Sequence, residues 1–113
     1  MEIEFVSPPR GDLVAWEVQF GEREGRYTVG TDGRVSYRHP ADERVWHAGV
    51  SIEQFRACAQ AWNTYVAEVK HIPEELAPAV VAKLHASLER AGVLRTPPSH
   101  WSMLLEQAEN GFL

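Results

Sequence analysis

Five histidines are the residues of this chain most able to bind a metal or move a proton. They are His39, His47, His71, His85 and His100. Two imidazoles reach one metal from a single strand or helix when they are spaced as His-x-His or His-x-x-x-His, and neither spacing occurs. The nearest approach to a ligand set is His39 with Asp42 and Glu43, a composition more typical of a solvated turn. We therefore predict surface or interface histidines and no metal site.

Three pairs of neighbouring carboxylates could act as acid and base if their surroundings separated the two pKa values. The pairs are Glu22 with Glu24, Asp42 with Glu43, and Glu74 with Glu75. Each pair falls in a polar turn or at a helix start, where ionised acidic groups are favourable. The sequence therefore predicts solvated carboxylates at these positions, without a catalytic pair.

Candidate nucleophiles lack the surroundings that would activate them. Cys58 falls on the apolar side of a predicted helix, where a thiolate would be poorly solvated, so we expect a small buried hydrophobic residue. No serine stands in a Gly-x-Ser-x-Gly turn, and the glycines between Gly21 and Gly33 do not form a phosphate-binding loop. These patterns favour a protein without catalytic residues or a cofactor.

Composition favours one domain, residues 1–113, because the 113 residues and 44% apolar content suffice for one core and not for two. The net charge of −5, with basic residues scattered among carboxylates, argues against nucleic acid and favours cationic protein partners. No apolar run is long enough to cross a membrane. The acidic start Met1-Glu2-Ile3-Glu4 is unlike a secretory signal, so we expect a cytoplasmic protein.

The first half of the chain alternates as strands do, between about residues 3 and 46. In residues 14–20 we expect Val14, Trp16, Val18 and Phe20 to face the core, and Glu17 and Gln19 to face solvent. The pair Asp32-Gly33 predicts a tight hairpin. Ile3 to Val6 could add an edge strand, which Pro8 and Pro9 would end. The prediction is an antiparallel meander of about three to five strands.

The second half changes to helical spacing, and it predicts helices over about 52–70, 78–91 and 100–110. Ser51 is an N-cap with Gln54 at the third helical position, and Val50 with Phe55 forms a hydrophobic staple. The solvent side of this helix carries Glu53, Arg56, Gln60 and Asn63. Gly92 ends the second helix, and Ser99 after the Pro97-Pro98 linker caps the third. We expect Phe112 and Leu113 to fold back onto the core of an α+β domain.

Trp46, Trp62 and Trp101 could stack on bases or sugars, but Trp62 and Trp101 fall at core positions of predicted helices, so we expect packing roles.

Two segments carry a resemblance to a known family. The segment Gly49-Val50-Ser51-Ile52-Glu53-Gln54-Phe55, after a short strand with Trp46, resembles the strand-to-helix step of the SUKH immunity superfamily, especially its fourth family. The segment from Trp101 to Gln107, with Gly111-Phe112-Leu113, is similar to the C-terminal helix of that family. The likeness covers roughly Tyr27 to Leu113. Members are usually longer at the amino end, so this chain is either a shortened member or one whose sheet another chain completes.

The resemblance implies an α+β domain whose sheet and loops bind and block a bacterial toxin, typically a nuclease or deaminase. No catalytic residue carries over. For partner binding we predict the hairpin carboxylates Glu22, Glu24, Asp32, Asp42 and Glu43, because nuclease sites are electropositive and complementary charge speeds association. Two alternatives remain. One is a homo-oligomeric interaction module without a toxin partner, and the other, the least favoured, is an enzyme using His39, His47 or Asp42.

Overall fold

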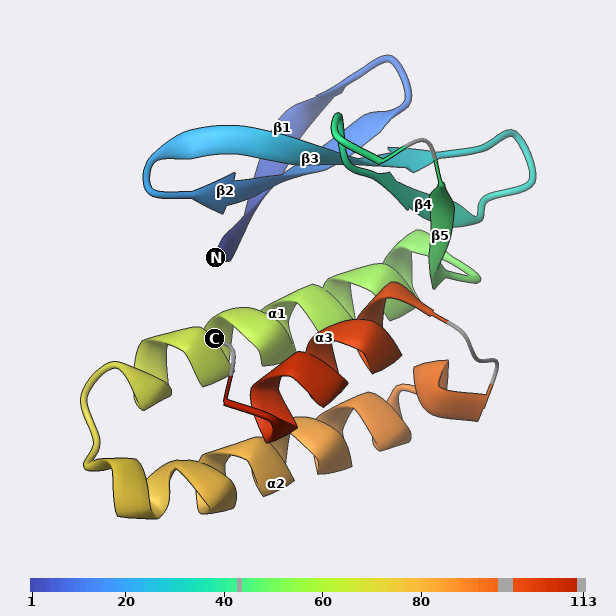
Figure 1. The fold of residues 1–113 in the computed structure, drawn as a ribbon. Helices are drawn as coiled ribbons and strands as arrows, with labels where there is room; N and C mark the ends of the chain where they lie inside the picture. Colours follow the sequence, from blue (N-terminus) through green and yellow to red (C-terminus); the bar gives the residue numbers. More distant parts are fainter. Residues whose placement is uncertain (43, 96–98, 112–113) are drawn as a thin grey trace.

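Five antiparallel strands form one sheet in which the spatial order follows the chain (Figure 1). The computed structural model describes residues 1–42, 44–95 and 99–111. The strands are β1 (Glu2–Arg10), β2 (Leu13–Gln19), β3 (Glu22–Val29), β4 (Val35–Arg38) and β5 (Val45–Gly49). The predicted α+β class, a meander followed by three helices, is confirmed. The predicted positions of Glu43, the Pro97-Pro98 linker and Phe112-Leu113 lie outside the described residues.

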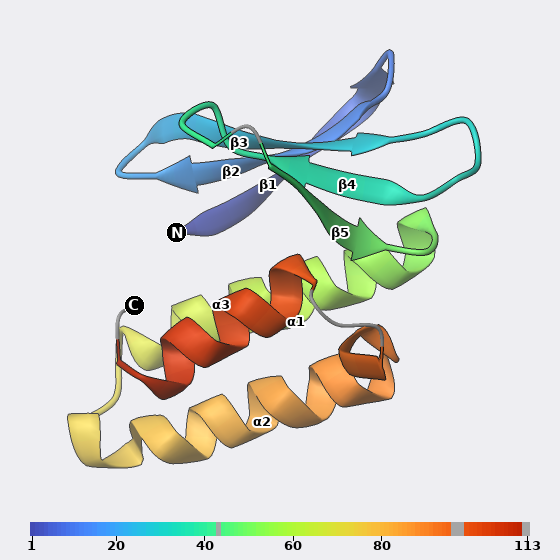
Figure 2. The same cartoon turned by 45° about the vertical axis from the view of Figure 1, so that its right-hand side comes forward.

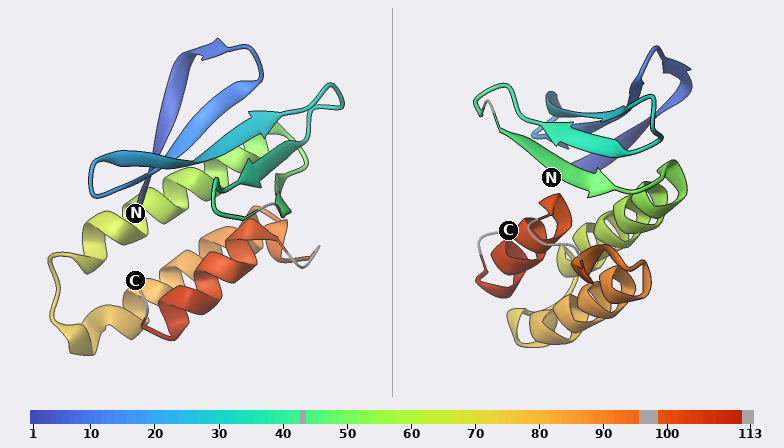
Figure 3. Two further views of the ribbon diagram at one scale, coloured as in Figure 1. Left: turned by 45° about the horizontal axis from the view of Figure 1, so that its top comes forward. Right: turned by 90° about the vertical axis from the view of Figure 1, so that its right-hand side faces the viewer.

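The helices all lie on one side of the sheet and make two further layers. They are α1 (Ile52–Val69), α2 (Ala77–Arg90) and α3 (His100–Glu109), with short 3-10 turns at Glu74–Leu76 and Val93–Arg95. α1 and α3 pack against the sheet, and α2 packs beneath them on the far side (Figures 2 and 3). The other face of the sheet is uncovered. In the described ranges, no helix is both long and apolar enough to span a membrane.

The inner face of the sheet is set by two tyrosines. Tyr27 on β3 stands directly opposite Tyr37 on β4, and both are buried beneath the strands. The register then places Ala15 of β2 opposite Tyr27, so that Ala15 and Glu17 face the helices. Because the side-chain period of a strand is two, the residues between them turn outward.

The prediction for residues 14–20 is therefore wrong about the faces. Glu17 is only 6% exposed, whereas Trp16 and Val18 lie on the uncovered side. Phe20 is not in the core at all, since its side chain is 95% exposed at the β2–β3 turn. β2 carries apolar residues on both sides, so its own alternation could not decide which side is buried.

β1 continues past the point where proline was expected to end it. It runs to Arg10 through a cis Ser7-Pro8 peptide bond, and its pairing with β2 shifts register between Phe5 and Arg10. Proline is tolerated here because β1 is an edge strand whose regular pairing with β2 is interrupted between Phe5 and Arg10, so no ladder hydrogen bond is lost.

The start of α1 follows the predicted cap with one difference. The Ser51 hydroxyl accepts a hydrogen bond from the Gln54 N–H at 3.1 Å, and the Gln54 side-chain oxygen accepts one from the Val50 N–H at 2.8 Å. Gln54 also donates to the carbonyl of Ala91 at 2.9 Å, which ties the start of α1 to the end of α2. Val50 is 53% exposed, so the predicted staple with Phe55 does not cover it.

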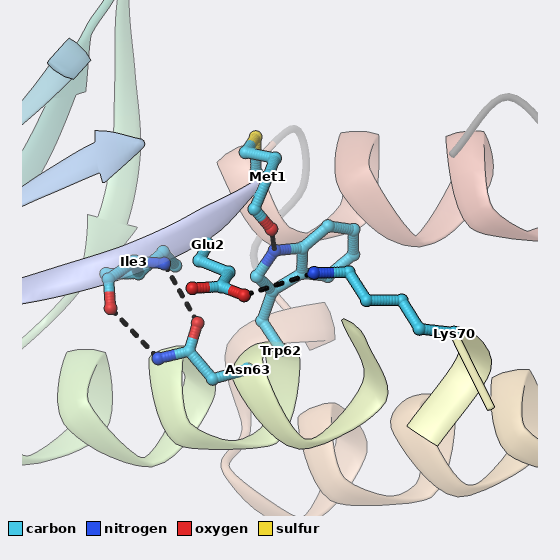
Figure 4. Close-up of polar contacts among 6 residues, drawn as sticks. All are labelled: Met1, Glu2, Ile3, Trp62, Asn63 and Lys70. Atoms are coloured by element: carbon cyan, nitrogen blue, oxygen red, sulfur yellow. Dashed lines mark hydrogen bonds and ion pairs between the residues drawn. The ribbon is translucent and has the colours of Figure 1, made fainter. Parts of the chain in front are cut away.

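Asn63 fastens β1 to α1, although it was expected on the solvent side of the helix. Its side-chain amide donates to the carbonyl of Ile3 and accepts from the N–H of Ile3, both at 2.9 Å (Figure 4). The Trp62 indole donates to the carbonyl of Met1 at 3.1 Å. The amide thus satisfies both backbone groups that Ile3 presents at the free edge of the sheet, as a neighbouring strand would.

We predict that Asn63→Ala lowers the free energy of unfolding by about 1–3 kcal/mol, because both backbone groups of Ile3 lose their partner. Urea unfolding of the variant measures this. Gln60→Ala, at an exposed position of the same helix, serves as the control and should change the stability little. Equal effects of the two substitutions would contradict the role given to Asn63.

Candidate functional site

A cavity of about 410 Å³ lies between the inner face of the sheet and α3, at the end of the sheet where β2 leads into β3. We call it the α3 cavity. Its lining combines carboxylates, imidazoles and aromatic rings from distant parts of the chain. The lining residues are Met1, Glu17, Gln19, Tyr37, His39, Asp42, Trp46, His100, Met103, Leu104 and Gln107. Titratable side chains thus meet a hollow of ligand size here.

Glu17 is the buried carboxyl group of this cavity. Burial raises its pKa above the ordinary value, and a hydrogen bond with Tyr37 opposes the rise only in part. The same burial and the same partner raise the pKa of the Tyr37 hydroxyl far above its usual range. Tyr37 can lie here because β3 has Gly25 beneath it, where any Cβ would overlap the tyrosine ring. The cavity therefore presents an acceptor that is poorly solvated.

His39 brings a second carboxylate into the cluster. A carboxylate oxygen of Glu17, one of Glu24 and a ring nitrogen of His39 lie within 4.8 Å of one another. Such a group of atoms could bind a cation. The hydrogen bonds of the imidazole favour another role. Its Nδ1 accepts from the Ala41 N–H at 3.1 Å, so in the neutral ring the proton is on Nε2, which faces the Glu24 carboxylate at 3.6 Å. A metal would need the lone pair of that nitrogen, so this geometry makes His39 a donor to carboxylates.

His100, predicted at the surface, is buried with 1% exposure. Its Nε2 lies 2.7 Å from the Tyr27 hydroxyl, and its ring stacks on Tyr37 with centroids 4.0 Å apart. Its Nδ1 has no hydrogen-bond partner among the described residues. Burial lowers the pKa of this imidazole to about 3, so the ring is neutral at physiological pH. It contributes shape and a single polar contact, without a charge.

We predict that His100 makes the protein sensitive to acid. Between pH 6.5 and about 3 the unfolded chain binds a proton at this residue and the folded chain does not, so stability falls as pH falls. The contribution is about 1.4 kcal/mol per pH unit within that window. Denaturant unfolding between pH 6 and 4 should show a shallower pH dependence for His100→Phe than for the wild type.

His85→Phe, at an exposed position of α2, is the matched control and should keep the wild-type pH dependence. The comparison uses the slope with pH, so a lower absolute stability of His100→Phe does not affect it. Parallel curves for wild type and His100→Phe would contradict the buried, neutral state of this residue.

The predicted partner-binding carboxylates lie at two ends of the sheet. Glu22 and Glu24 follow the β2–β3 turn, and Asp42 lines the α3 cavity at the same end. Asp32 lies in the β3–β4 turn at the other end of β3, where it accepts from the Arg34 N–H at 3.1 Å. Glu43 lies outside the described residues. The structure thus places Asp42 in the lining of the α3 cavity and Glu24 next to His39 of that lining, and it leaves Asp32 apart.

Phe20 forms the tip of the hairpin beside this cavity. Gln19 pairs with Glu22, so the loop has two residues, Phe20 and Gly21, with φ of 53° and 81°. A two-residue loop with both φ values positive is the type I′ geometry, in which asparagine and glycine are favoured and a bulky side chain is strained. An aromatic ring is therefore held out in water by a conformation that does not suit it.

Sequence reasoning did not identify Glu17, Tyr37 or His100 as neighbours. Their proximity depends on the register of three strands and on where α3 crosses the sheet. The one usable signal was the pair of tyrosines at matching positions of a predicted hairpin, since Tyr27 and Tyr37 must share a face. Neither a protein-family model, nor a curated protein, nor a solved structure matches the chain.

Proposed function

We propose that this chain is a non-catalytic binding protein of the immunity type, which neutralises a partner bacterial toxin of the nuclease or deaminase class by occlusion. The observation that carries the proposal is Phe20, whose side chain is 95% exposed at the tip of a hairpin flanked by carboxylates. The resemblance of residues 49–55 to the SUKH superfamily gives the class of partner.

Phe20 supports binding because folding alone does not account for it. A non-glycine residue in the left-handed region costs about 1–2 kcal/mol, and an exposed ring recovers little of that by packing. Aromatic residues that insert into a pocket of a partner contribute disproportionately to affinity. The hairpin offers such an anchor on a short, paired support, so little conformational entropy is lost when it docks.

The surrounding carboxylates support an electropositive partner. Glu22 and Glu24 follow the anchor on β3, and Glu17 and Asp42 line the adjacent α3 cavity. A lysine or arginine of the partner that entered this cavity would meet the carboxyl group of Glu17, which is buried and poorly screened by water. Nuclease sites are positively charged because they bind phosphates, so an acidic surface of this kind both attracts and covers them.

The Phe20→Asn variant tests the anchor. Asparagine suits a positive φ, so we expect the free energy of unfolding to rise by about 1 kcal/mol. The proposal predicts that the toxin is encoded beside this gene. The affinity of the variant for that toxin should fall at least about tenfold, which corresponds to about 1.4 kcal/mol. Denaturant unfolding and calorimetric titration with the purified toxin measure the two effects.

Leu76→Asn is the control, since Leu76 is also an exposed apolar residue and lies in the 3-10 turn before α2. It should leave toxin affinity unchanged. If the wild-type chain neither binds that toxin nor rescues cells that express it, the proposed function is wrong. If the wild-type chain binds the toxin and Phe20→Asn does not weaken binding, the role of Phe20 as an anchor is wrong.

A second variant tests the charges. We expect Glu24→Gln combined with Asp42→Asn to slow association with the toxin, and the difference from wild type to shrink as salt is added. Asp42→Asn keeps the side-chain oxygen that accepts from the Arg44 N–H at 2.9 Å, so the loop is retained. Asp32→Asn, at the other end of β3, is the control. Stopped-flow measurements give the association rates. Equal rates for the double variant and for Asp32→Asn would contradict the role given to Glu24 and Asp42.

A further inference from the structure

The uncovered face of the sheet carries a row of side chains with a charge opposite to that of the whole chain. The register aligns Trp16 of β2 with Arg26 of β3, and Arg26 with Arg38 of β4. All three point away from the helices, because Tyr27 and Tyr37 point toward them. Figure 3 shows that α1, α2 and α3 leave this face open. We call these three residues the Trp16 row.

The two arginines of the row repel each other. Residues that stand directly opposite on antiparallel strands have Cβ atoms about 4.5–5.5 Å apart, and like charges at such positions destabilise the sheet. Both side chains are exposed, and neither forms an ion pair within the described ranges. By contrast, Arg23 on the same face is paired with Glu4. Arg26 and Arg38 thus hold two positive charges together, and neither has an ion-pair partner in the described chain.

The surroundings of the two arginines are suited to an anion. Thr28 and Ser36 stand directly opposite each other one step further along the strands, on the same face. With Trp16, Arg26 and Arg38 they line a hollow of about 430 Å³, in which Asp12 is the one acidic residue among the described residues of the lining. Two guanidinium groups and two hydroxyl groups offer many donors in one place, and guanidinium groups bind carboxylates through paired hydrogen bonds. The indole of Trp16 adds an apolar surface at one side.

We propose that the Trp16 row binds an acidic peptide segment of a protein partner. One carboxylate lies between Arg26 and Arg38, and the neighbouring residue of the segment packs on Trp16. A protein segment fits better than a nucleic acid, because Glu4, Asp12 and Glu24 surround the row and would repel the regular phosphates of a strand passing over it. One or two carboxylates avoid that repulsion. Arg26 and Arg38 are not part of the proposed toxin-binding surface, although Glu24 borders both sites.

Titration of the full chain tests the site, with a ten-residue peptide that carries one glutamate beside one leucine in an otherwise glycine-serine sequence. Intrinsic tryptophan fluorescence and calorimetry are the readouts. The double variant Arg26→Gln with Arg38→Gln should bind the peptide at least about tenfold more weakly, because two charge-assisted contacts are lost. It should unfold at the same or a higher denaturant concentration than wild type, because the repulsion is removed. Arg56→Gln with Arg90→Gln, exposed on α1 and α2, removes the same charge elsewhere and should bind as wild type does.

A 12-nucleotide single-stranded DNA provides the competing outcome. The proposal is overturned if the peptide does not bind, if the helix variant weakens binding as much as the sheet variant, or if the DNA binds more tightly than the peptide. Phe20→Asn should leave peptide binding unchanged. Failure of this site and failure of the proposed function are therefore separable.

Discussion

The Tyr27 side chain is the contact on which the arrangement of sheet and helices depends. It is fully buried, and its ring packs against Tyr37, Phe55 and His100 with centroids 5.0, 4.9 and 5.4 Å apart. Its hydroxyl reaches the imidazole of His100 at 2.7 Å. One side chain of β3 thus contacts β4, α1 and α3 at once, and its single polar atom is satisfied inside the core.

The burial of Tyr27 determines where both candidate surfaces lie. Because Tyr27 and Tyr37 must face the helices, their strand neighbours Arg26 and Arg38 must face away. The same register turns Glu17 inward toward Tyr37 and Trp16 outward beside Arg26. The positions of the α3 cavity and of the Trp16 row therefore both follow from the burial of Tyr27 and Tyr37.

The helices were predictable from the sequence because their signals are local. Ser51 and Ser99 cap α1 and α3, Gly92 follows α2 with φ of 82°, and the apolar stripe of α3 is buried as expected. These features depend on residues three or four positions apart, so they can be read without knowing the fold. The meander was predictable for the same reason, from alternation and the Asp32-Gly33 turn.

The candidate site was not predictable, because its members are joined by pairing between strands. Glu17 lies in a strand with valine and tryptophan on one face and alanine on the other. Its charge was the only reason to predict that it faces solvent. His100 precedes a tryptophan at a helix start, and nothing local distinguishes a buried imidazole from an exposed one. Asn63 was assigned to solvent by the helical pattern, although its amide meets an edge strand 60 residues away.

Two features retain an energetic cost that a single substitution could remove. Asparagine in place of Phe20 would relieve a positive φ, and a neutral residue in place of Arg26 or Arg38 would relieve a repulsion across the sheet. None of these changes would disturb the core around Tyr27, because the three side chains are exposed. Folding stability therefore does not explain why these residue types stand here, whereas the partner contacts that we propose would explain them. The net charge of −5 does not describe how the charges are distributed, since Glu17 and Asp42 line the α3 cavity while Arg26 and Arg38 stand opposite each other on the uncovered face.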